Sequence, residues 1–525
     1  MYTALKKSLS ALSAEEDKEF RNHFVETKYL KRLASNDSDL VYGTKGVGKT
    51  ALRRALTELN DQYYFNSTTI DLESISFEAV YDKLSALNST VKHEMHTLAK
   101  ATWKNTLLNY ALLSLADKLP KDNQLKNKIV SVLKEDGFVI SGGHSASENS
   151  NYRLLNIIEI IFQKIVSLPL TQNNYLVGVT AEQQNVVNKF PLNDKLSALL
   201  DEAVNVVKQN SKSILVCIDG FDSIVKHTPE SREAIFAGLI AAIYDYRLNA
   251  TLSEVFCFKA FLPHELTIEA CKINWEGDKH LNNIHFLSWE ENDFKSFIGK
   301  RFSPFSKKKS SKFNDVWTEF MPEKIMNLVH NVEENTFDYI IRHTLYRPRQ
   351  VLNHIYNIIK LWDEHNSTSE KIHPSFIPSA IAKNNKVMAT KVAEQLSIIY
   401  PNVINFLKSW QGSSCIIEVT KFREKINRYF FAEAGVINNT ETDKIFDELF
   451  DLGLFGISSD KPINSFSKKI EFRFSFVGDN IDSSIHDSIS SEDLIAFSPM
   501  FREYCGCQSA PQGIIVPIAL DNFEY

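Results

Sequence analysis

Short apolar runs alternate with helical periodicities over residues 37–290. The apolar runs predict strands at residues 39–42, 68–72, 213–219, 253–262 and 283–287. Apolar positions recurring every three or four residues predict helices at 51–59 and 231–246. Strands that are apolar throughout are typical of a parallel sheet buried on both faces. The pattern therefore predicts an α/β fold with a five-stranded parallel sheet covered by helices.

The stretch between the second and third predicted strands is long and mostly helical. Residues 73–212 contain amphipathic patterns at 77–87, 95–119, 125–133 and 154–168. Residues 136–151 are rich in Gly, Ser and Asn, which predicts a loop. We therefore expect a helical insertion at 73–212 within the sheet domain.

The rest of the chain predicts mainly helices. Residues 1–36 are helical and polar, and we expect them to pack on the edge of the sheet domain. Residues 291–302 predict an amphipathic helix, and residues 322–343 two short helices. A further helix is predicted from Pro348 to residue 362, since proline is favourable at the start of a helix. We interpret residues 291–375 as a helical lid.

Residues 376–525 form a third predicted domain. A helix at 440–452 ends at Gly453. Strict alternation at 470–476 predicts a half-buried strand, with 460–467 as the turn before it. Helices followed by a short strand pair resemble a winged-helix module, which binds DNA or protein.

Composition and charge narrow the class of protein. The 525 residues are 43% apolar and 24% charged, with a net charge of −6, which disfavours a strongly basic nucleic-acid binder without excluding a local basic face. The basic loop at 303–312 is interpreted as solvated rather than as a nucleic-acid contact. The N-terminus carries no signal-peptide pattern, and no apolar run is long enough to span a bilayer. Scattered cysteines predict no disulfide framework, so we expect a cytoplasmic protein without a membrane partner.

A glycine-rich loop carries the clearest chemistry. Residues 43–50 fit the phosphate-binding pattern G-x-x-x-x-G-K-[ST] and lie between a predicted strand and a predicted helix. Its backbone N–H groups and the helix N-terminus would face the phosphates. Lys49 would reach the β- and γ-phosphates, and the Thr50 hydroxyl would ligate Mg²⁺. The predicted nucleotide-binding residues are Gly43, Thr44, Lys45, Gly46, Val47, Gly48, Lys49, Thr50 and Ala51.

Two aspartates follow the third predicted strand. Asp219 ends an apolar run, and an acid at that position in a chain with a phosphate loop is suited to binding Mg²⁺, directly or through water. Asp222 lies three residues later and could polarise the attacking water or complete the metal shell. The alternative for Asp219 is a helix cap or a loop acid.

An arginine opens the helix predicted at Pro348. Arg349 would be held near that helix end by a rigid turn, from where its planar fork can reach a γ-phosphate. The alternative is an ordinary surface arginine.

These motifs together resemble the additional-strand P-loop ATPases, in particular the STAND class near NACHT ATPases and the origin-recognition type of AAA+ protein. Asp219-Gly-Phe-Asp222 matches the acidic motif that NACHT-like sequences carry after the third strand. His264 stands where such proteins place a first sensor, and Pro348-Arg349 looks like their second sensor. The segment 286–301 resembles bacterial P-loop ATPases of antiviral defence loci.

The resemblance implies an ATP- and Mg²⁺-dependent regulatory ATPase. Gly220 stands where AAA+ enzymes usually have a catalytic glutamate, which predicts slow hydrolysis. The resemblance also implies self-association and a separate effector protein, as in an antiphage defence switch. The alternative is an AAA+-like initiator or loader that binds DNA through its winged-helix tail.

Overall fold

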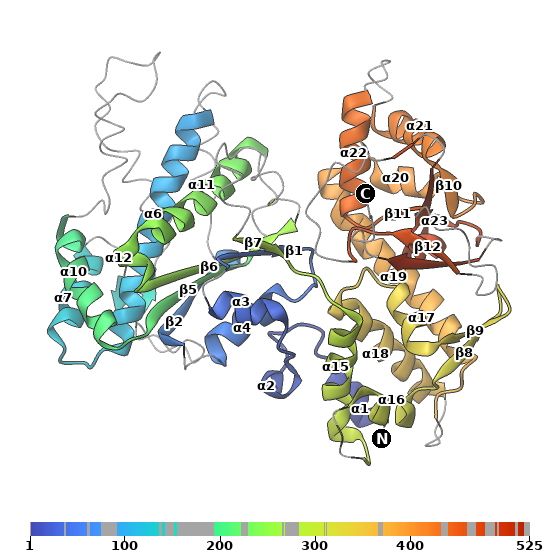
Figure 1. The fold of residues 1–525 in the computed structure, drawn as a ribbon, viewed down its shortest axis with the longest axis horizontal. Coiled ribbons are helices and arrows are strands. Elements are labelled where there is room, and N and C mark those ends of the chain that lie inside the picture. Colours follow the sequence, from blue (N-terminus) through green and yellow to red (C-terminus); the bar gives the residue numbers. More distant parts are fainter. Residues whose placement is uncertain are drawn as a thin grey trace. The chain divides into compact units, whose positions relative to one another are not determined.

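The computed structural model describes residues 2–35, 38–59, 63–74, 92–135, 139–141, 152–154, 194–221, 229–264, 267, 283–308, 310, 312–365, 371–431, 439–458, 469–477, 489–490, 493–509 and 513–518. The chain divides into two compact units (Figure 1). The sheet unit comprises Glu26–Thr44 and Lys49–His285, and the C-terminal unit comprises Met1–Val25, Lys45–Gly48 and Phe286–Tyr525. We describe each unit by itself.

The sheet unit is built on a five-stranded sheet, which confirms the predicted α/β fold. Its strands are β1 (Leu40–Gly43), β2 (Tyr64–Asp71), β5 (Ser213–Asp219), β6 (Phe256–Pro263) and β7 (Ile284–Phe286). Their spatial order is β2-β5-β6-β1-β7. The pairs β2–β5, β5–β6 and β6–β1 are parallel. All eight residues of β6 are buried, because helices cover both faces of the sheet.

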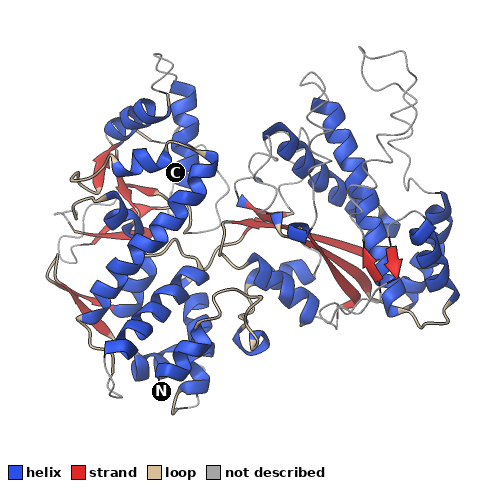
Figure 2. Cartoon of the chain, turned by 180° about the vertical axis from the view of Figure 1, so that it is seen from behind, coloured by secondary structure: helices blue, strands red, loops and turns tan. Residues whose placement is uncertain are grey.

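Helices on the two faces come from different parts of the sequence. On one face, α3 (Lys28–Ala34) packs on α4 (Lys49–Glu58), which contacts β1, β5 and β6 (Figures 1 and 2). On the other face, α6 (Lys92–Lys118) contacts β2 and β5, and α11 (Pro229–Leu248) contacts β6. The indole N–H of Trp103 on α6 donates to the carbonyl oxygen of Ile235 on α11, over 2.9 Å. The predicted insertion therefore supplies a helix that covers the sheet itself.

The remaining described elements of the insertion lie around these helices. They are η1 (Leu72–Ser74), α7 (Gln124–Glu135), the antiparallel pair β3 (Val139–Ser141) and β4 (Tyr152–Leu154), and α10 (Asp194–Gln209). Outside the insertion, α12 (Ala250–Ser253) follows α11. The loop predicted at 136–151 thus contains one short strand. The helix predicted at 77–87, and the one predicted at 154–168 beyond Leu154, lie outside the described residues.

One half of the C-terminal unit is a helical core that includes the N-terminus of the chain. Its later elements are α15 (Glu291–Phe302), η4 (Ser303–Phe305), α16 (Phe313–Phe320), β8 (Lys324–Asn327), β9 (Val332–Asn335), α17 (Thr336–Arg342) and α18 (Pro348–His365). The N-terminal segment adds α1 (Tyr2–Leu9) and α2 (Phe20–His23). Tyr2, Leu5 and Leu9 are buried in this core. Of the residues 1–36 that we expected at the edge of the sheet domain, α3 packs on α4 of the sheet unit, whereas residues 1–25 belong to the C-terminal unit.

Residues 322–343 form a hairpin and one helix rather than the two helices we predicted. Strands β8 and β9 pair antiparallel, with Ile325 buried and Met326 exposed. Asn331 in the turn has a φ of 50°, a left-handed conformation that asparagine tolerates. The side chain of Asn335 accepts hydrogen bonds from Phe337 and Asp338 and so caps α17.

The other half of the C-terminal unit combines helices with a second five-stranded sheet. Its elements are α20 (Val403–Lys408), β10 (Ile416–Glu418), α21 (Val419–Phe430), α22 (Asn439–Asp451), β11 (Phe455–Ser458), β12 (Lys469–Arg473), β13 (Leu494–Phe497), η6 (Pro499–Phe501), α23 (Arg502–Cys505) and β14 (Ile514–Ile518). The helix predicted at 440–452 is α22. The predicted strand pair is β11 and β12, which pair antiparallel. Strand β13 lies between β10 and β11, and β14 pairs parallel with β12, so the sheet extends beyond the pair we predicted.

A long helix, α19 (Phe376–Ile399), contributes to both halves of the C-terminal unit. Ile377 and Ile381 are buried in the helical core, whereas Met388 and Ala393 are buried with the second sheet. The domain boundary at 375/376 remains a prediction. Among the described residues, no helix is both long and apolar enough to cross a bilayer.

Two buried histidines connect α17, α18 and α19. The Nε2 of His354 lies 3.1 Å from the carbonyl oxygen of His343, and its Nδ1 lies 3.0 Å from the side-chain amide of Asn384. Neutral imidazole satisfies both contacts, with one nitrogen donating and the other accepting. Burial lowers the pKa of His354 to about 4 and that of His343 well below its usual range.

We expect acid to destabilise the chain through His354. Because its pKa is lower in the folded chain, the unfolded chain binds the proton first as the pH falls from 6.5 towards 4. The stability present above pH 6.5 is lost across this window, by about 3 kcal/mol for one such group. Urea unfolding at a series of pH values measures the loss. His354→Gln should flatten the profile in this window relative to wild type, and identical profiles would contradict the assignment.

Candidate functional site

The glycine-rich loop connects β1 to α4, as the sequence predicts. Strand β1 ends at Gly43, and α4 begins at Lys49, which places Thr50 and Ala51 in its first turn. Gly46 and Gly48 have φ values of 88° and 111°, a left-handed backbone that glycine adopts without strain. The loop thus sits at the carboxyl edge of a parallel sheet and at a helix N-terminus, where anions bind favourably.

Lys49 lies across the base of this loop. Its ammonium group donates to the carbonyl oxygens of Gly43, over 2.7 Å, and of Thr44, over 3.2 Å. Both acceptors are neutral, so an anion at the loop would be a stronger partner for the same charge. The lysine is therefore placed to bind phosphate.

The tip of the loop, Lys45–Gly48, belongs to the C-terminal unit. The indole N–H of Trp289 donates to the carbonyl oxygen of Val47 over 2.7 Å, and Arg347 donates to that of Lys45 over 3.4 Å. A Cβ added to Gly46 would lie 3.4 Å from the Cβ of Arg349. The arginine predicted from the sequence therefore lies against the loop tip.

Sequence reasoning missed two of these three tip contacts. Arg347 is buried while Arg349, the second residue of α18, is exposed. Trp289 packs against Phe294 and Phe297, with ring centroids 5.2 and 5.5 Å away. The Arg-Pro-Arg sequence around Pro348 was the available signal for Arg347, and no pattern marked the indole as a loop contact.

Asp219 ends β5, as predicted, and each of its carboxylate oxygens has a donor. One accepts from the backbone N–H of Gly220 over 2.9 Å, and the other lies 3.1 Å from Nε of Arg53. Burial raises the pKa of Asp219, while Arg53, the Gly220 N–H and Lys49 oppose that rise. In the register of the sheet, Asp219 is directly opposite Asp71, the last residue of β2.

These residues fit a magnesium–nucleotide site. A threonine hydroxyl in the first turn of α4 and a partly buried carboxylate at a strand end are the hard oxygen ligands that Mg²⁺ prefers. Within the described residues, no group of three or more His, Cys, Asp or Glu side chains could hold a metal by itself. Mg²⁺ that accompanies a nucleotide is usually bound through one or two protein carboxylates together with phosphate oxygens.

The other predicted site residues have different outcomes. Asp222 lies outside the described residues. His264 follows β6 and is buried, with its ring stacked on that of Tyr42 of β1 at a centroid distance of 5.7 Å. Its neighbour in the predicted sensor segment, Glu265, lies outside the described residues. The sensor role of His264 therefore remains a prediction.

Gly220 leaves no room for a side chain. Its φ is 84°, and an added Cβ would lie 2.5 Å from a carboxylate oxygen of Asp71 and 2.9 Å from the backbone nitrogen of Glu73. Glutamate at this position would have to displace the end of β2 and the backbone that follows it. The absence of an acid directly after Asp219 is therefore built into the packing of this sheet edge.

We expect Gly220→Ala to destabilise the chain by about 3 kcal/mol. A non-glycine residue at this φ costs about 1–2 kcal/mol, and overpacking adds about 1–3 kcal/mol. Gly412→Ala is the matched control, since Gly412 has a φ of 76° and nothing within 4 Å of its Cβ position. Urea unfolding should show the smaller loss for Gly412→Ala. Equal losses of stability in the two variants would mean that the close approach to Asp71 contributes nothing to the destabilisation.

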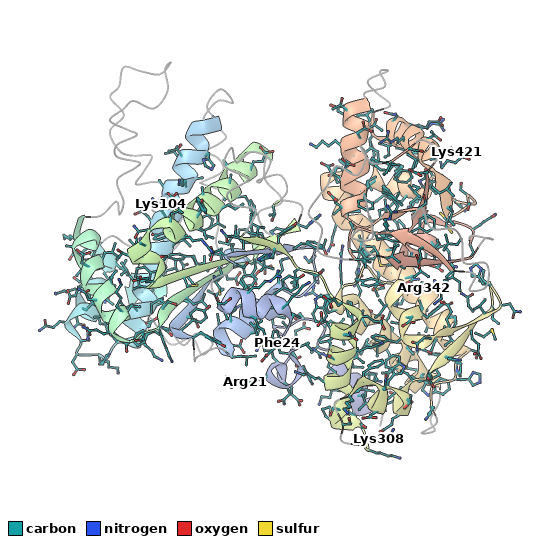
Figure 3. All side chains as sticks on the ribbon, in the orientation of Figure 1. Arg21, Phe24, Lys104, Lys308, Arg342 and Lys421 are labelled. Carbon is teal, nitrogen blue, oxygen red and sulfur yellow. The ribbon has the colours of Figure 1, made fainter. Side chains whose placement is uncertain are left out.

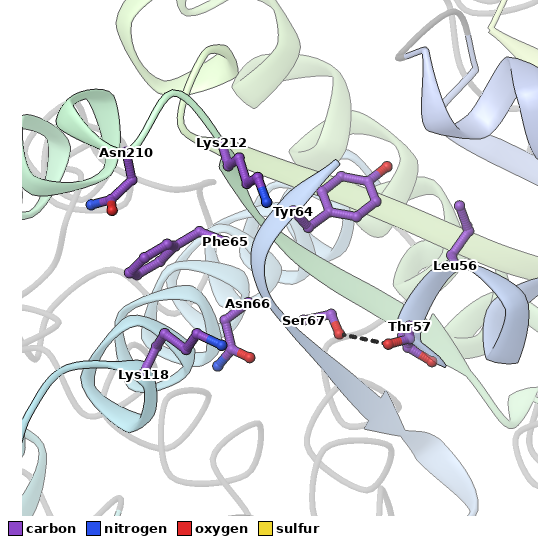
Figure 4. A pocket seen from close by; sticks show the side chains of 9 residues that line it. All are labelled: Leu56, Thr57, Tyr64, Phe65, Asn66, Ser67, Lys118, Asn210 and Lys212. Atoms are coloured by element: carbon purple, nitrogen blue, oxygen red, sulfur yellow. Dashed lines mark hydrogen bonds between the residues drawn. The ribbon is translucent and has the colours of Figure 1, made fainter. Parts of the chain in front are cut away.

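A separate hollow lies at the opposite edge of the sheet. It measures about 440 Å³ and is found where β2 begins and where α4, α6 and α10 end (Figure 4). Its polar lining includes Thr57, Asn66, Ser67, Lys118, Asn210 and Lys212. The two lysines are exposed, so this is an open polar surface, and it does not coincide with the phosphate loop.

Comparison with known proteins agrees with this geometry. A family model described as ORC-CDC6-like matches residues 8–227. The chain is similar to this family of AAA+ P-loop ATPases. A second model, a FunZ-associated C-terminal helical domain, matches residues 292–384, which cover α15 from its second residue and all of α16 to α18. No curated protein matches the chain.

Solved structures show more distant similarity. The Aeropyrum pernix ORC2 protein in its ADPNP–ADP complexes is 11% identical, with 90% of this chain and 87% of that chain covered and a TM-score of 0.33. The Aeropyrum pernix ORC1 protein in complex with DNA is 11% identical, with 82% and 83% covered and a TM-score of 0.31.

Proposed function

We propose that this chain is a regulatory ATPase that binds ATP and hydrolyses it slowly. The observation that carries the proposal is the sheet edge formed by the phosphate loop, Asp219 and Gly220. The loop and Asp219 supply the parts that a magnesium–nucleotide site requires. Gly220 supplies no general base, and the close approach of Asp71 leaves no space for one. An edge that binds nucleotide without an adjacent catalytic acid suits a switch better than a motor.

Each residue has a role in this proposal. The loop N–H groups and Lys49 bind the phosphates, Thr50 and Asp219 hold Mg²⁺, and Asp222 positions the attacking water. Mg²⁺, when bound, neutralises charge on the phosphate oxygens. Arg349 reports the γ-phosphate, and Arg347 and Trp289 hold the loop tip through its carbonyl oxygens.

We further propose that the switch is of the STAND type and acts in bacterial antiphage defence. Support comes from the sequence resemblance of residues 286–301 to ATPases of defence loci and from the acidic motif at 219–222. In this proposal, ATP promotes self-association, and a separate effector protein carries out the response. The protein is expected to act in the cytoplasm.

ATP turnover and self-association test the proposal. We expect turnover on the order of 10⁻² s⁻¹ or slower, as in P-loop GTPases acting without a partner. Light scattering after size-exclusion chromatography should show larger assemblies with ATP than without it. Phage plating on cells that carry the gene and its neighbours should show protection that is lost in the Lys49→Ala variant. Absence of ATP binding to the wild type would refute the ATPase, and unchanged plating would refute the defence role alone.

A second candidate function is a DNA-binding initiator or loader. The ORC-CDC6-like match favours it. In this candidate, residues 376–525 form the predicted winged helix, and α21 is the helix that contacts DNA. Lys421 and Arg428 on α21 are exposed, and Lys421 projects outward (Figure 3). Salt-dependent binding of duplex DNA that is lost in Lys421→Glu with Arg428→Glu would favour this candidate. No binding at low salt would exclude it.

A further inference from the structure

Arg53 links the helix after the phosphate loop to the aspartate at the end of β5. Its Nε lies 3.1 Å from a carboxylate oxygen of Asp219, and its Nη1 lies 3.4 Å from the hydroxyl of Thr69 on β2. The side chain of Arg53 is 19% exposed and that of Asp219 is 14% exposed. This partly buried ion pair is therefore weakly screened by solvent.

The position of Arg53 follows from the periodicity of α4. Residues four apart lie on the same face of a helix, so Arg53 follows Lys49 along the face that meets the carboxyl edge of the sheet. Arg54, one position later, instead pairs with Glu58 over 2.6 Å. Two adjacent arginines thus have different partners, one at the candidate metal ligand and one within α4 itself.

Each carboxylate oxygen of Asp219 has a donor in this arrangement. The Gly220 N–H binds one oxygen and Arg53 the other. A divalent cation that uses this carboxylate must share it with a guanidinium, which stays charged at every accessible pH. Two cations near one carboxylate repel each other, and the repulsion is strong where solvent is limited.

We propose that Arg53 is an electrostatic brake on the metal site. It holds Asp219 as a paired carboxylate and weakens binding of the divalent cation that accompanies the nucleotide. This inference rests on the nucleotide site proposed above and concerns how that site is regulated. It keeps metal loading, and with it hydrolysis, slow until the Arg53–Asp219 contact opens. Arg53 acts through Asp219 and is therefore a positioning residue.

Metal binding in the presence of ATP tests the brake. Mn²⁺ replaces Mg²⁺ and is titrated by electron paramagnetic resonance on the full chain. Arg53→Met keeps the aliphatic stem and removes the charge, and we expect it to bind Mn²⁺ about tenfold more tightly than wild type. Arg53→Lys keeps the charge and should stay within about threefold of wild type. Equal or weaker binding of Mn²⁺ by Arg53→Met overturns the brake.

Arg54→Met is the matched control, because its ion pair with Glu58 does not involve Asp219. Its affinity for Mn²⁺ should equal that of wild type. A tenfold gain in Arg54→Met as well would show a general effect of helix charge and would also overturn the brake.

Unfolding of the nucleotide-free chain separates this inference from the proposed function. Arg53→Met should lower the urea midpoint more in the wild-type background than in an Asp219→Asn background, where the partner charge is absent and only the contact with Thr69 is lost. An equal shift of the urea midpoint in both backgrounds means that the ion pair does not form. That result refutes the role of Arg53 and leaves the proposed ATPase function unaffected. If the wild type binds no ATP, the proposed ATPase function is refuted. The proposed role of Arg53 is then refuted as well, whatever the unfolding data show.

Discussion

Lys49→Ala is expected to weaken ATP binding by about 100-fold or more. Lys49 carries the positive charge that lies over the loop base, within 2.7 Å of the Gly43 carbonyl oxygen. Charge-assisted contacts with phosphate oxygens each contribute about 1.5–3 kcal/mol, and 2.7 kcal/mol corresponds to about 100-fold in affinity. Titration calorimetry with ATP and Mg²⁺ measures the loss directly. The thermal shift that saturating ATP gives the wild type should disappear in the variant.

Lys45→Ala is the matched control for this experiment. Lys45 lies in the same loop and is exposed, and its contact with Arg347 is made by its backbone carbonyl oxygen, which the substitution retains. ATP affinity should change by about threefold or less, since an exposed charge contributes little. Equal losses of ATP affinity in the two variants would show that binding depends on the net charge of the loop rather than on the position of Lys49. No loss in Lys49→Ala would place the nucleotide elsewhere.

The phosphate loop could be predicted because its chemistry is local. Glycine spacing fixes the positive φ values of Gly46 and Gly48, and the apolar runs before and after fix the strand and helix. Asp219 was predicted for a similar reason, since it ends a run that only a buried strand explains. These predictions needed no knowledge of which distant segments meet.

The contacts that surround the site join segments that are far apart in the sequence, and no local sequence pattern indicates them. Arg53 reaches a residue 166 positions away, and Trp289 reaches a loop residue 242 positions away. Helical periodicity places Arg53 on a face but does not name its partner. The hairpin formed by β8 and β9 was mistaken for helix because its strands are only four residues long. Strands β13 and β14 were missed because their partners are remote in sequence.

The same distant packing explains why Gly220 matters. From the sequence, Gly220 marks only a missing glutamate. In the folded sheet it is the point where the backbone after β5 passes the carboxylate of Asp71 on β2. A change in catalytic chemistry at this position would therefore require a change at the end of the neighbouring strand. Slow hydrolysis, as proposed, would then be a property of two strands together rather than of one residue.

Lys259→Met is expected to destabilise the sheet unit by about 3–5 kcal/mol. Lys259 is fully buried on β6, and its ammonium group donates to the Ser38 carbonyl oxygen over 2.6 Å and to Asp39 over 2.9 Å. Removing this ammonium group leaves Asp39 with only the partly exposed Arg247 as a counter-ion and takes a donor from the buried Ser38 carbonyl, and loss of one partner of a buried pair costs about this much. For a unit of this size the melting temperature should fall by about 10 °C. Differential scanning calorimetry measures the change.

Two further variants show whether the cost comes from the buried charge. Arg247→Met removes the other cation on Asp39, but that side chain is 34% exposed, so the loss should be about 1 kcal/mol or less. Asp39→Asn combined with Lys259→Met removes both buried charges and should recover part of the stability lost in Lys259→Met. If the double variant is less stable than the sum of the single changes, the lysine acts through packing. If Arg247→Met costs as much as Lys259→Met, the two cations share Asp39 equally despite their different burial.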